Sequence, residues 1–210
     1  MKPLLRSSFG KYRDLVLLIA LFLLIDAGVS VINIYTSHQI EADASRINAA
    51  GQMRASAQQL TKGLLTLNME IRSGAPTQSS QAEISQARLG FLDAQSHLQG
   101  KPGQVITNSL LEAESQSQKI QAQLAQISQT WMPIEREVEP LLLTDQLDSD
   151  TVASAVSKAL TRNNRLTQQA DDLGLSLEEL AQDKTSTMRT IQTFAIILAF
   201  LNFLFIVFKF

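Results

Sequence analysis

The sequence predicts an all-α protein, an antiparallel four-helix bundle whose first and fourth helices continue into two transmembrane helices. Apolar residues recur at three- and four-residue steps through most of the chain, as on the buried face of an amphipathic helix. Gly and Pro occur together in two short breaks, at 73–77 and 100–103, and two long apolar stretches lie near the ends. No run of alternating Val, Ile or aromatic residues indicates a sheet.

The two long apolar stretches, residues 15–34 and 190–208, are candidate membrane spans. Each approaches the roughly 20 residues that are needed to cross a bilayer core. Four basic residues precede the first span: Lys2, Arg6, Lys11 and Arg13. Because cytoplasmic flanks are rich in Lys and Arg, we expect a cytoplasmic tail over 1–14, a periplasmic central domain over 35–189 and a cytoplasmic end at 209–210. This arrangement predicts a two-pass protein of a bacterial inner membrane.

A cleaved signal peptide is the alternative interpretation of the first apolar stretch. The small residues Ala27, Gly28 and Ser30 could support cleavage after the apolar core. We favour an uncleaved span because apolar residues continue as far as Ile34. Under either interpretation the central domain lies outside the cytoplasm.

Polar residues inside the two spans are candidates for a role in the membrane. Asp26 lies in the first span and Asn202 in the second. A lone carboxylate in a bilayer core is energetically expensive and is a functional candidate by default. The alternatives for Asp26 are a snorkelling or protonated side chain at a dimer contact and a tolerated charge in an over-extended span.

The central domain divides into four predicted helices. The first continues out of the membrane to about Arg72, where residues 73–77 break it, and the second covers about 80–98. A Gly- and Pro-containing break follows at 100–103.

The third helix is predicted to start near Ile106, with Ile106, Leu110, Ala113 and later apolar positions at helical spacing. We expect it to be kinked or ended by Pro133 and again by Pro140, because proline lacks the backbone donor. Asp150 is the expected N-cap of the fourth helix, which runs on into the second span. Short connections favour the antiparallel bundle and place the first and fourth helices side by side.

Composition excludes several classes of function. The chain has no cysteine, which removes disulfides and thiolate sites, and its two histidines fall on different predicted helices. Residues 35–189 hold 13 Lys and Arg against 18 Asp and Glu, a net charge of −5, so nucleic acid is not an expected partner. Glu135, Glu137 and Glu139 alternate around a helix and do not form an acid/base pair. We expect no enzyme activity, no metal and no cofactor.

The first helix carries a second face besides its apolar one. Five positions fall within roughly 80° of one another: Ile47, Gly51, Arg54, Gln58 and Lys62. The apolar positions centre roughly 140° away and comprise Met53, Ala57, Leu60, Leu64, Leu67 and Ile71. We expect the apolar face to be buried in the bundle and the face with Arg54 to meet another molecule.

Arg54 is the candidate ligand-binding residue of that face. Taken alone, an arginine on a helix is by default a solvated charge. Gly51, one turn earlier, allows close approach of a second helix, and Asn48 and Gln58 offer hydrogen bonds. If two copies pack along this face, two guanidinium groups converge where they suit a planar oxyanion or carboxylate. Two guanidinium groups without a bound anion repel each other, so a bound anion would stabilise the homodimer. Lys62 is expected to be a solvated or rim charge.

The same residues carry a family resemblance. The pattern I-N-x-A-G-x-x-R-x-x-x-Q resembles the signature of the N-terminal sensor domain of type IV pilus methyl-accepting chemotaxis transducers, the PilJ type. It is also similar to the P-box of nitrate/nitrite sensor histidine kinases. The matching residues are Ile47, Asn48, Ala50, Gly51, Arg54 and Gln58. Ala55, Ser56, Ala57 and Gln59 depart from the usual pattern, and the nitrate-sensing version has a basic residue where Ala49 stands.

The resemblance extends to Trp131, expected to be a core residue, and to residues 163–166. It implies a sensor domain in which relatives that bind nitrate use this arginine at the dimer interface. Nitrate, nitrite and small carboxylates are the ligands it suggests.

Three functions remain open at the level of sequence. The favoured one is a transmembrane input module for chemotaxis or two-component signal transduction, which relays ligand binding through its first and fourth helices. The chain ends at Phe210 without an output domain, so we expect either the input portion of a longer receptor or a protein that signals through a cytoplasmic or membrane partner. A dimeric membrane-anchored scaffold of a larger complex is the second function, and a tail-anchored adhesin or stress protein is the third.

Overall fold

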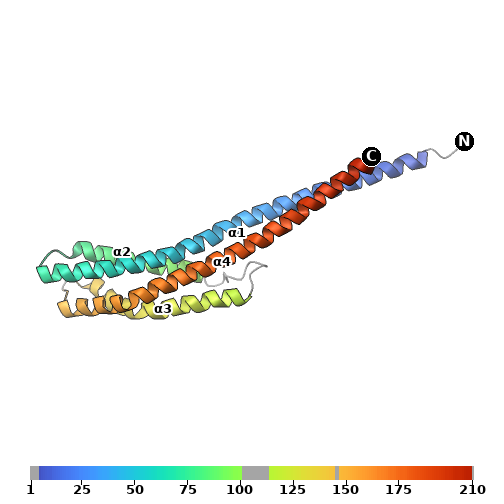
Figure 1. The fold of residues 1–210 in the computed structure, drawn as a ribbon. Coiled ribbons are helices and arrows are strands. Elements are labelled where there is room, and N and C mark those ends of the chain that lie inside the picture. Colours follow the sequence, from blue (N-terminus) through green and yellow to red (C-terminus); the bar gives the residue numbers. More distant parts are fainter. Residues whose placement is uncertain (1–4, 101–113, 145–146, 210) are drawn as a thin grey trace. The chain divides into compact units, whose positions relative to one another are not determined.

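The computed structural model describes residues 5–100, 114–144 and 147–209, which form four α-helices and no strand. These are α1 (Leu5–Ser73), α2 (Gln78–Gln99), α3 (Glu114–Leu143) and α4 (Ser149–Lys209) (Figure 1). The all-α prediction is confirmed. The chain divides into two compact units: the apolar helix pair, Met1–Ala42 with Gln182–Phe210, and the central bundle, Asp43–Ala181.

The helices of the central bundle are antiparallel to their neighbours (Figure 1). Between α1 and α4, Arg54 contacts Asp171 and Thr61 contacts Asn163, so one helix ascends as the other descends. The pairs Arg88–Glu135 and Gln95–Ser128 show the same opposite direction for α2 and α3. The prediction that the first and fourth helices lie side by side is confirmed within the bundle.

The predicted apolar face of α1 forms one wall of the core. Met53, Ala57, Leu60, Leu64 and Leu67 are buried. Ile71 is partly buried and packs against the same cluster. Phe91 on α2 and Trp131 on α3 stack in this core with their ring centroids 3.8 Å apart, as expected for Trp131 as a core residue. The three- and four-residue periodicity therefore identified the buried face correctly.

The loop predicted after Arg72 is confirmed, because α1 ends at Ser73. Gly74 adopts a φ of 66°, a left-handed conformation that glycine tolerates well. Its N–H donates to the Ile71 carbonyl, and the Ala75 N–H donates to the Glu70 carbonyl. This pair of bonds satisfies carbonyls that the end of the helix would leave unpaired. The next break is confirmed at Gly100, which follows α2 with a φ of 73°.

Of the two effects expected of the prolines in α3, a kink or an end, the structure excludes the end. The helix contains both Pro133 and Pro140 and continues to Leu143, so neither proline ends it. The carbonyls that lose a donor belong to Gln129 and Arg136, four residues earlier, and both residues are exposed. Solvent can hydrate exposed carbonyls, which lowers the cost of the missing bonds. The predicted start near Ile106, with Leu110 and Ala113, lies outside the described residues.

The N-cap of α4 also differs from the prediction. The helix starts at Ser149, and the Asp148 carboxylate accepts hydrogen bonds from the Thr151 N–H at 3.0 Å and the Thr151 hydroxyl at 3.1 Å. Asp148 is therefore the capping residue. Asp150, the expected cap, lies in the first turn, where its negative charge favours the helix N-terminus.

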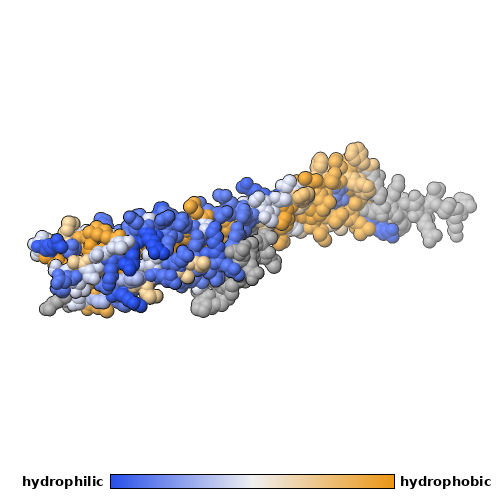
Figure 2. Space-filling model, turned by 60° about the horizontal axis from the view of Figure 1, so that its bottom comes forward, coloured by the Kyte–Doolittle hydropathy of each residue, from blue (hydrophilic) through white to orange (hydrophobic). Residues whose placement is uncertain are grey.

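The apolar helix pair contains the two membrane-length stretches. Both α1 and α4 include a segment long and apolar enough to cross a membrane, and almost none of either segment is buried. Figure 2 shows that apolar residues cover most of the visible face of this unit. Helices of this composition that were the core of a soluble protein would be buried, whereas these helices present their apolar side chains outward.

Candidate functional site

The face of α1 that carries Arg54 is exposed, as the sequence predicted. We call Ile47, Gly51, Arg54, Gln58 and Lys62 the Arg54 stripe. Four of its members are exposed and Ile47 is half-buried. Asn48 is also exposed, whereas its neighbours Ala49 and Ala50 are buried in the core. The two faces of α1 therefore separate as expected, with the Arg54 stripe left for contacts outside the bundle.

The stripe continues towards the end of α1 with apolar residues. Leu65 and Met69 follow Lys62 at three- and four-residue steps and lie on the same side of the helix. Leu65 is 38% exposed and Met69 is 63% exposed. On the neighbouring α4, Leu160 and Leu175 are also exposed. Apolar side chains therefore line this side of the bundle on both helices.

Arg54 itself is held by an ion pair with α4. Its Nη1 donates a hydrogen bond of 2.7 Å to Asp171 Oδ1. The side chains are 49% and 46% exposed, so the pair lies at the surface of the bundle. An exposed pair of this kind contributes about 0.2–1 kcal/mol to stability. The contact fixes the direction of the guanidinium and joins α1 to α4.

Asp171 is the site residue that the sequence did not reveal. It lies 117 residues from Arg54, and nothing in its local pattern distinguishes it from other acidic residues on helices. Its presence changes the expected electrostatics of a dimer. Two Arg54 side chains that each carry their own counter-ion repel each other less than two free cations would. In the dimer expected from the sequence, Asp171 would therefore reduce the repulsion between two Arg54 guanidinium groups that hold no anion.

Gly51 does not serve helix packing within the bundle. A Cβ added at Gly51 would meet nothing within 4 Å, so its side of α1 is open to a helix from another molecule. The close approaches inside the bundle occur at Gly63 and Gly90 instead. An added Cβ at Gly63 would lie 2.8 Å from Ile84 Cγ1, and one at Gly90 would lie 2.9 Å from Ser56 Oγ.

Lys62 is a solvated charge, one of the two alternatives that the sequence predicted for it. Its Nζ lies 3.5 Å from Glu83 Oε1 on α2, and its side chain is 74% exposed. A contact this long and this exposed adds little stability. Lys62 therefore stays available to solvent at the edge of the Arg54 stripe.

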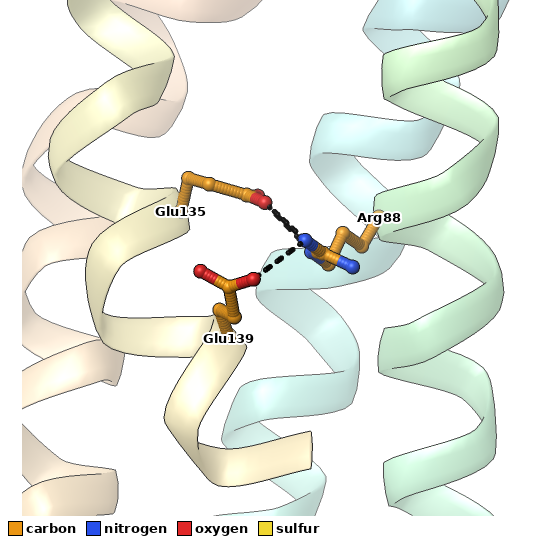
Figure 3. Close-up of polar contacts among 3 residues, drawn as sticks. All are labelled: Arg88, Glu135 and Glu139. Atoms are coloured by element: carbon orange, nitrogen blue, oxygen red, sulfur yellow. Dashed lines mark hydrogen bonds and ion pairs between the residues drawn. The ribbon is translucent and has the colours of Figure 1, made fainter. Parts of the chain in front are cut away.

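The three glutamates of α3 make structural ion pairs. Glu135 and Glu139, one turn apart, both reach Arg88 on α2, at 2.6 Å and 3.5 Å from its Nη2 (Figure 3). Glu137 turns the other way, towards Lys158 and Ser154 on α4. The hydrogen bond from Lys158 lowers the pKa of Glu137, and the bond from Ser154 acts in the same direction. The sequence correctly placed Glu137 on a different side of the helix from its neighbours. It did not reveal that Glu135 and Glu139 both contact Arg88.

The polar residues of the apolar helix pair make specific contacts. Asn202 Nδ2 donates to the Leu18 carbonyl at 3.1 Å, and Gln192 Nε2 donates to Asn33 Oδ1 at 2.7 Å. Both bonds join α1 to α4. Asp26 is exposed on this unit. Asn202 is thus bonded to backbone, while Asp26 faces away from the helix pair.

A family model for the N-terminal domain of type IV pili methyl-accepting chemotaxis transducers, PilJ, matches residues 35–157. This match covers more than half of the chain. The chain belongs to the PilJ family. The match includes the Arg54 stripe and Trp131 but ends before residues 163–166, to which the sequence resemblance was extended. No match was found among curated proteins or among solved structures.

Membership of the PilJ family indicates the general role of the protein. PilJ domains belong to chemotaxis transducers, and this chain adds two helices that are long and apolar enough to span a membrane. The combination fits a membrane sensory module that signals to partners in a chemotaxis-type pathway. Among the residues that the structure describes, no group of three or more His, Asp or Glu could hold a metal ion.

Proposed function

We propose that the central bundle is a periplasmic input domain that binds a small anion where the Arg54 stripes of two copies meet. The exposed guanidinium of Arg54 is the observation that carries this proposal. A planar guanidinium group, here with its side chain 49% exposed, suits a planar oxyanion or a carboxylate through charge-assisted hydrogen bonds. The ligand class is therefore nitrate, nitrite or a small carboxylate.

The surroundings of Arg54 support a second copy as the occupant of this face. Gly51 leaves the backbone of α1 open, and Leu65 and Met69 expose apolar area on the same side. A symmetric dimer would place the same patch of both copies against each other and cover these side chains. The carboxylates of the two Asp171 residues would balance the charge of the two Arg54 residues in the absence of ligand.

Signal transmission follows from the length of the helices. Each of α1 and α4 is one continuous helix that includes both a wall of the central bundle and an apolar stretch of membrane length. We propose that anion binding favours one arrangement of α1 against α4 and that this change passes through the inner membrane to a signalling partner. The ligand must bind the two arrangements with different affinity for such a shift to occur.

The experiment compares the full chain with Arg54→Ala in lipid nanodiscs. Thermal stability is measured against sodium nitrate, nitrite and acetate, with sodium chloride as the ionic-strength control. A ligand at a hundredfold excess over its Kd raises stability by about 2.7 kcal/mol when it binds only the folded state. We expect at least one anion to stabilise the wild type and not Arg54→Ala. Arg136→Ala, which removes an exposed arginine from α3, should respond as the wild type does.

A stable dimer without any anion response would favour the scaffold function instead. In that case Arg54→Ala would change assembly alone. Equal anion shifts in the wild type and in Arg54→Ala would place the binding site elsewhere on the protein.

A further inference from the structure

We propose that Asp171 is an internal competitor for Arg54, so that an anion binds by displacing this carboxylate and thereby removes one contact between α4 and α1. This inference rests on the proposed anion site and adds its regulation. The observation that carries it is the direct hydrogen bond between the candidate ligand-binding guanidinium and a carboxylate of the same chain.

The competition follows from the chemistry of the two groups. A carboxylate is a planar oxyanion and therefore belongs to the ligand class that the guanidinium suits. Asp171 Oδ1 lies 2.7 Å from Arg54 Nη1, within the range of a charge-assisted hydrogen bond. An anion that takes the same N–H groups must replace Asp171. With both side chains about half exposed, the bond is weak enough to open.

The local charge makes displacement necessary for tight binding. Asp171 balances the charge of Arg54, so the ion pair carries no net charge. An added anion therefore gains no net attraction as long as Asp171 stays beside Arg54. When Asp171 turns away, the anion gains the guanidinium and loses its nearest negative neighbour. The ion pair thus sets the anion concentration at which the site fills.

Displacement also has a structural consequence. The Arg54–Asp171 pair links α1 to α4, the two helices that contain the membrane-length stretches. Breaking this ion pair removes one contact between α1 and α4, whereas the neighbouring contact from Thr61 to Asn163 remains. Ligand binding is in this way coupled to the contact between the two helices. A single carboxylate connects occupancy of the site with the proposed output.

The experiment measures anion affinity of the full chain in nanodiscs by titration calorimetry with sodium nitrate, nitrite and acetate. The variants are Asp171→Asn and its matched control Asp172→Asn, which removes the same charge from a position about 100° further around the helix. We expect Asp171→Asn to bind at least one anion about three- to tenfold more tightly than the wild type. Asp172→Asn should change the Kd less than twofold. The double variant Arg54→Ala/Asp171→Asn should lose binding.

Three outcomes would overturn the inference, and they separate it from the proposed function. Equal affinity of the wild type and Asp171→Asn would remove the competition while the anion site stands. Equal gains for both Asp→Asn variants would indicate a general charge effect. No binding of any anion to any variant, Asp171→Asn included, would remove the anion site itself. Circular dichroism and a second variant, Asp171→Ser, check that the result reflects the lost carboxylate and not a lost fold.

Discussion

Gly63 is a residue at which α1 and α2 approach each other closely. An added methyl group there would meet the side chain of Ile84, which is completely buried. The side chain cannot move aside without disturbing the core, because protein interiors are closely packed. The glycine is therefore required by the neighbouring helix and not by the backbone of α1.

Gly63→Ala should destabilise the central bundle by up to about 2 kcal/mol. The overpacking costs about 1–3 kcal/mol, which exceeds the gain of up to about 1 kcal/mol in helix propensity. Thermal unfolding can be followed through Trp131, the single tryptophan, which is buried against Phe91. Gly174→Ala is the control, since its Cβ would lie at an ordinary 3.9 Å from Ala50 Cβ and should leave stability equal or higher. A Gly63→Ala protein as stable as the wild type would contradict this packing.

Arg54 shows how far a single residue can be interpreted from sequence. Its exposure followed from the angle between the stripe and the apolar face, which depends only on positions within one helix. Its partner did not follow, because the contact with Asp171 depends on the register of α4 against α1. That register is set by packing of the whole core, and no local pattern records it.

At the scale of the element, the termini of the helices depend on single hydrogen bonds. The start of α4 is fixed by Asp148, whose carboxylate accepts from both the N–H and the hydroxyl of Thr151. The sequence predicted Asp150 as the N-cap of α4, in a segment that contains several Asp residues. A shift of two residues is the usual scale of such errors, since neighbouring Asp residues satisfy the same preference.

Asp148→Ala should lower stability by about 1 kcal/mol, within a usual range of about 0.5–2 kcal/mol for lost caps. Asp150→Ala should have a smaller effect, of about 0.3–1 kcal/mol, because it removes only a favourable charge from the first turn. Thermal unfolding of the two variants decides between the residues. A larger loss of stability for Asp150→Ala than for Asp148→Ala would indicate that Asp150 caps α4, as the sequence predicted.

The contact between α3 and α4 should give the bundle a dependence on pH. Because Lys158 lowers the pKa of Glu137, the ionised carboxylate stabilises the fold. This contribution is fully present above the ordinary pKa of glutamate, about 4.3, and is lost as the pH falls through the lowered value in the folded state.

The difference in stability between the wild type and Glu137→Gln should therefore be constant near neutral pH and shrink in acid. Thermal unfolding at a series of pH values measures this difference. The same comparison in a Lys158→Gln background should show a weaker dependence on pH. A difference that grows as the pH falls would contradict the assigned pair.

At the scale of the whole molecule, the sequence predicted the helical bundle with its two apolar helices because both rest on long, repeated signals. Four periodic segments and the short breaks between them define the helices, and about 20 apolar residues define each membrane-length stretch. The sequence left open whether the two prolines of α3 kink or end the helix, since the cost of a proline depends on the surroundings of the carbonyl that loses its donor. Single positions decide that cost, and a pattern over a segment does not.

The central claim is that two copies meet along the Arg54 stripe, and the absence of cysteine makes it directly testable. A single cysteine in place of exposed Gln58 would lie in the proposed interface, whereas Gln121→Cys on α3 is the matched control. Disulfides form only when the two Cα atoms are within about 7 Å. Under mild oxidation in membranes, we predict covalent dimers for Gln58→Cys and few for Gln121→Cys. No dimer at Gln58, or equal amounts at both positions, would contradict an interface along this stripe.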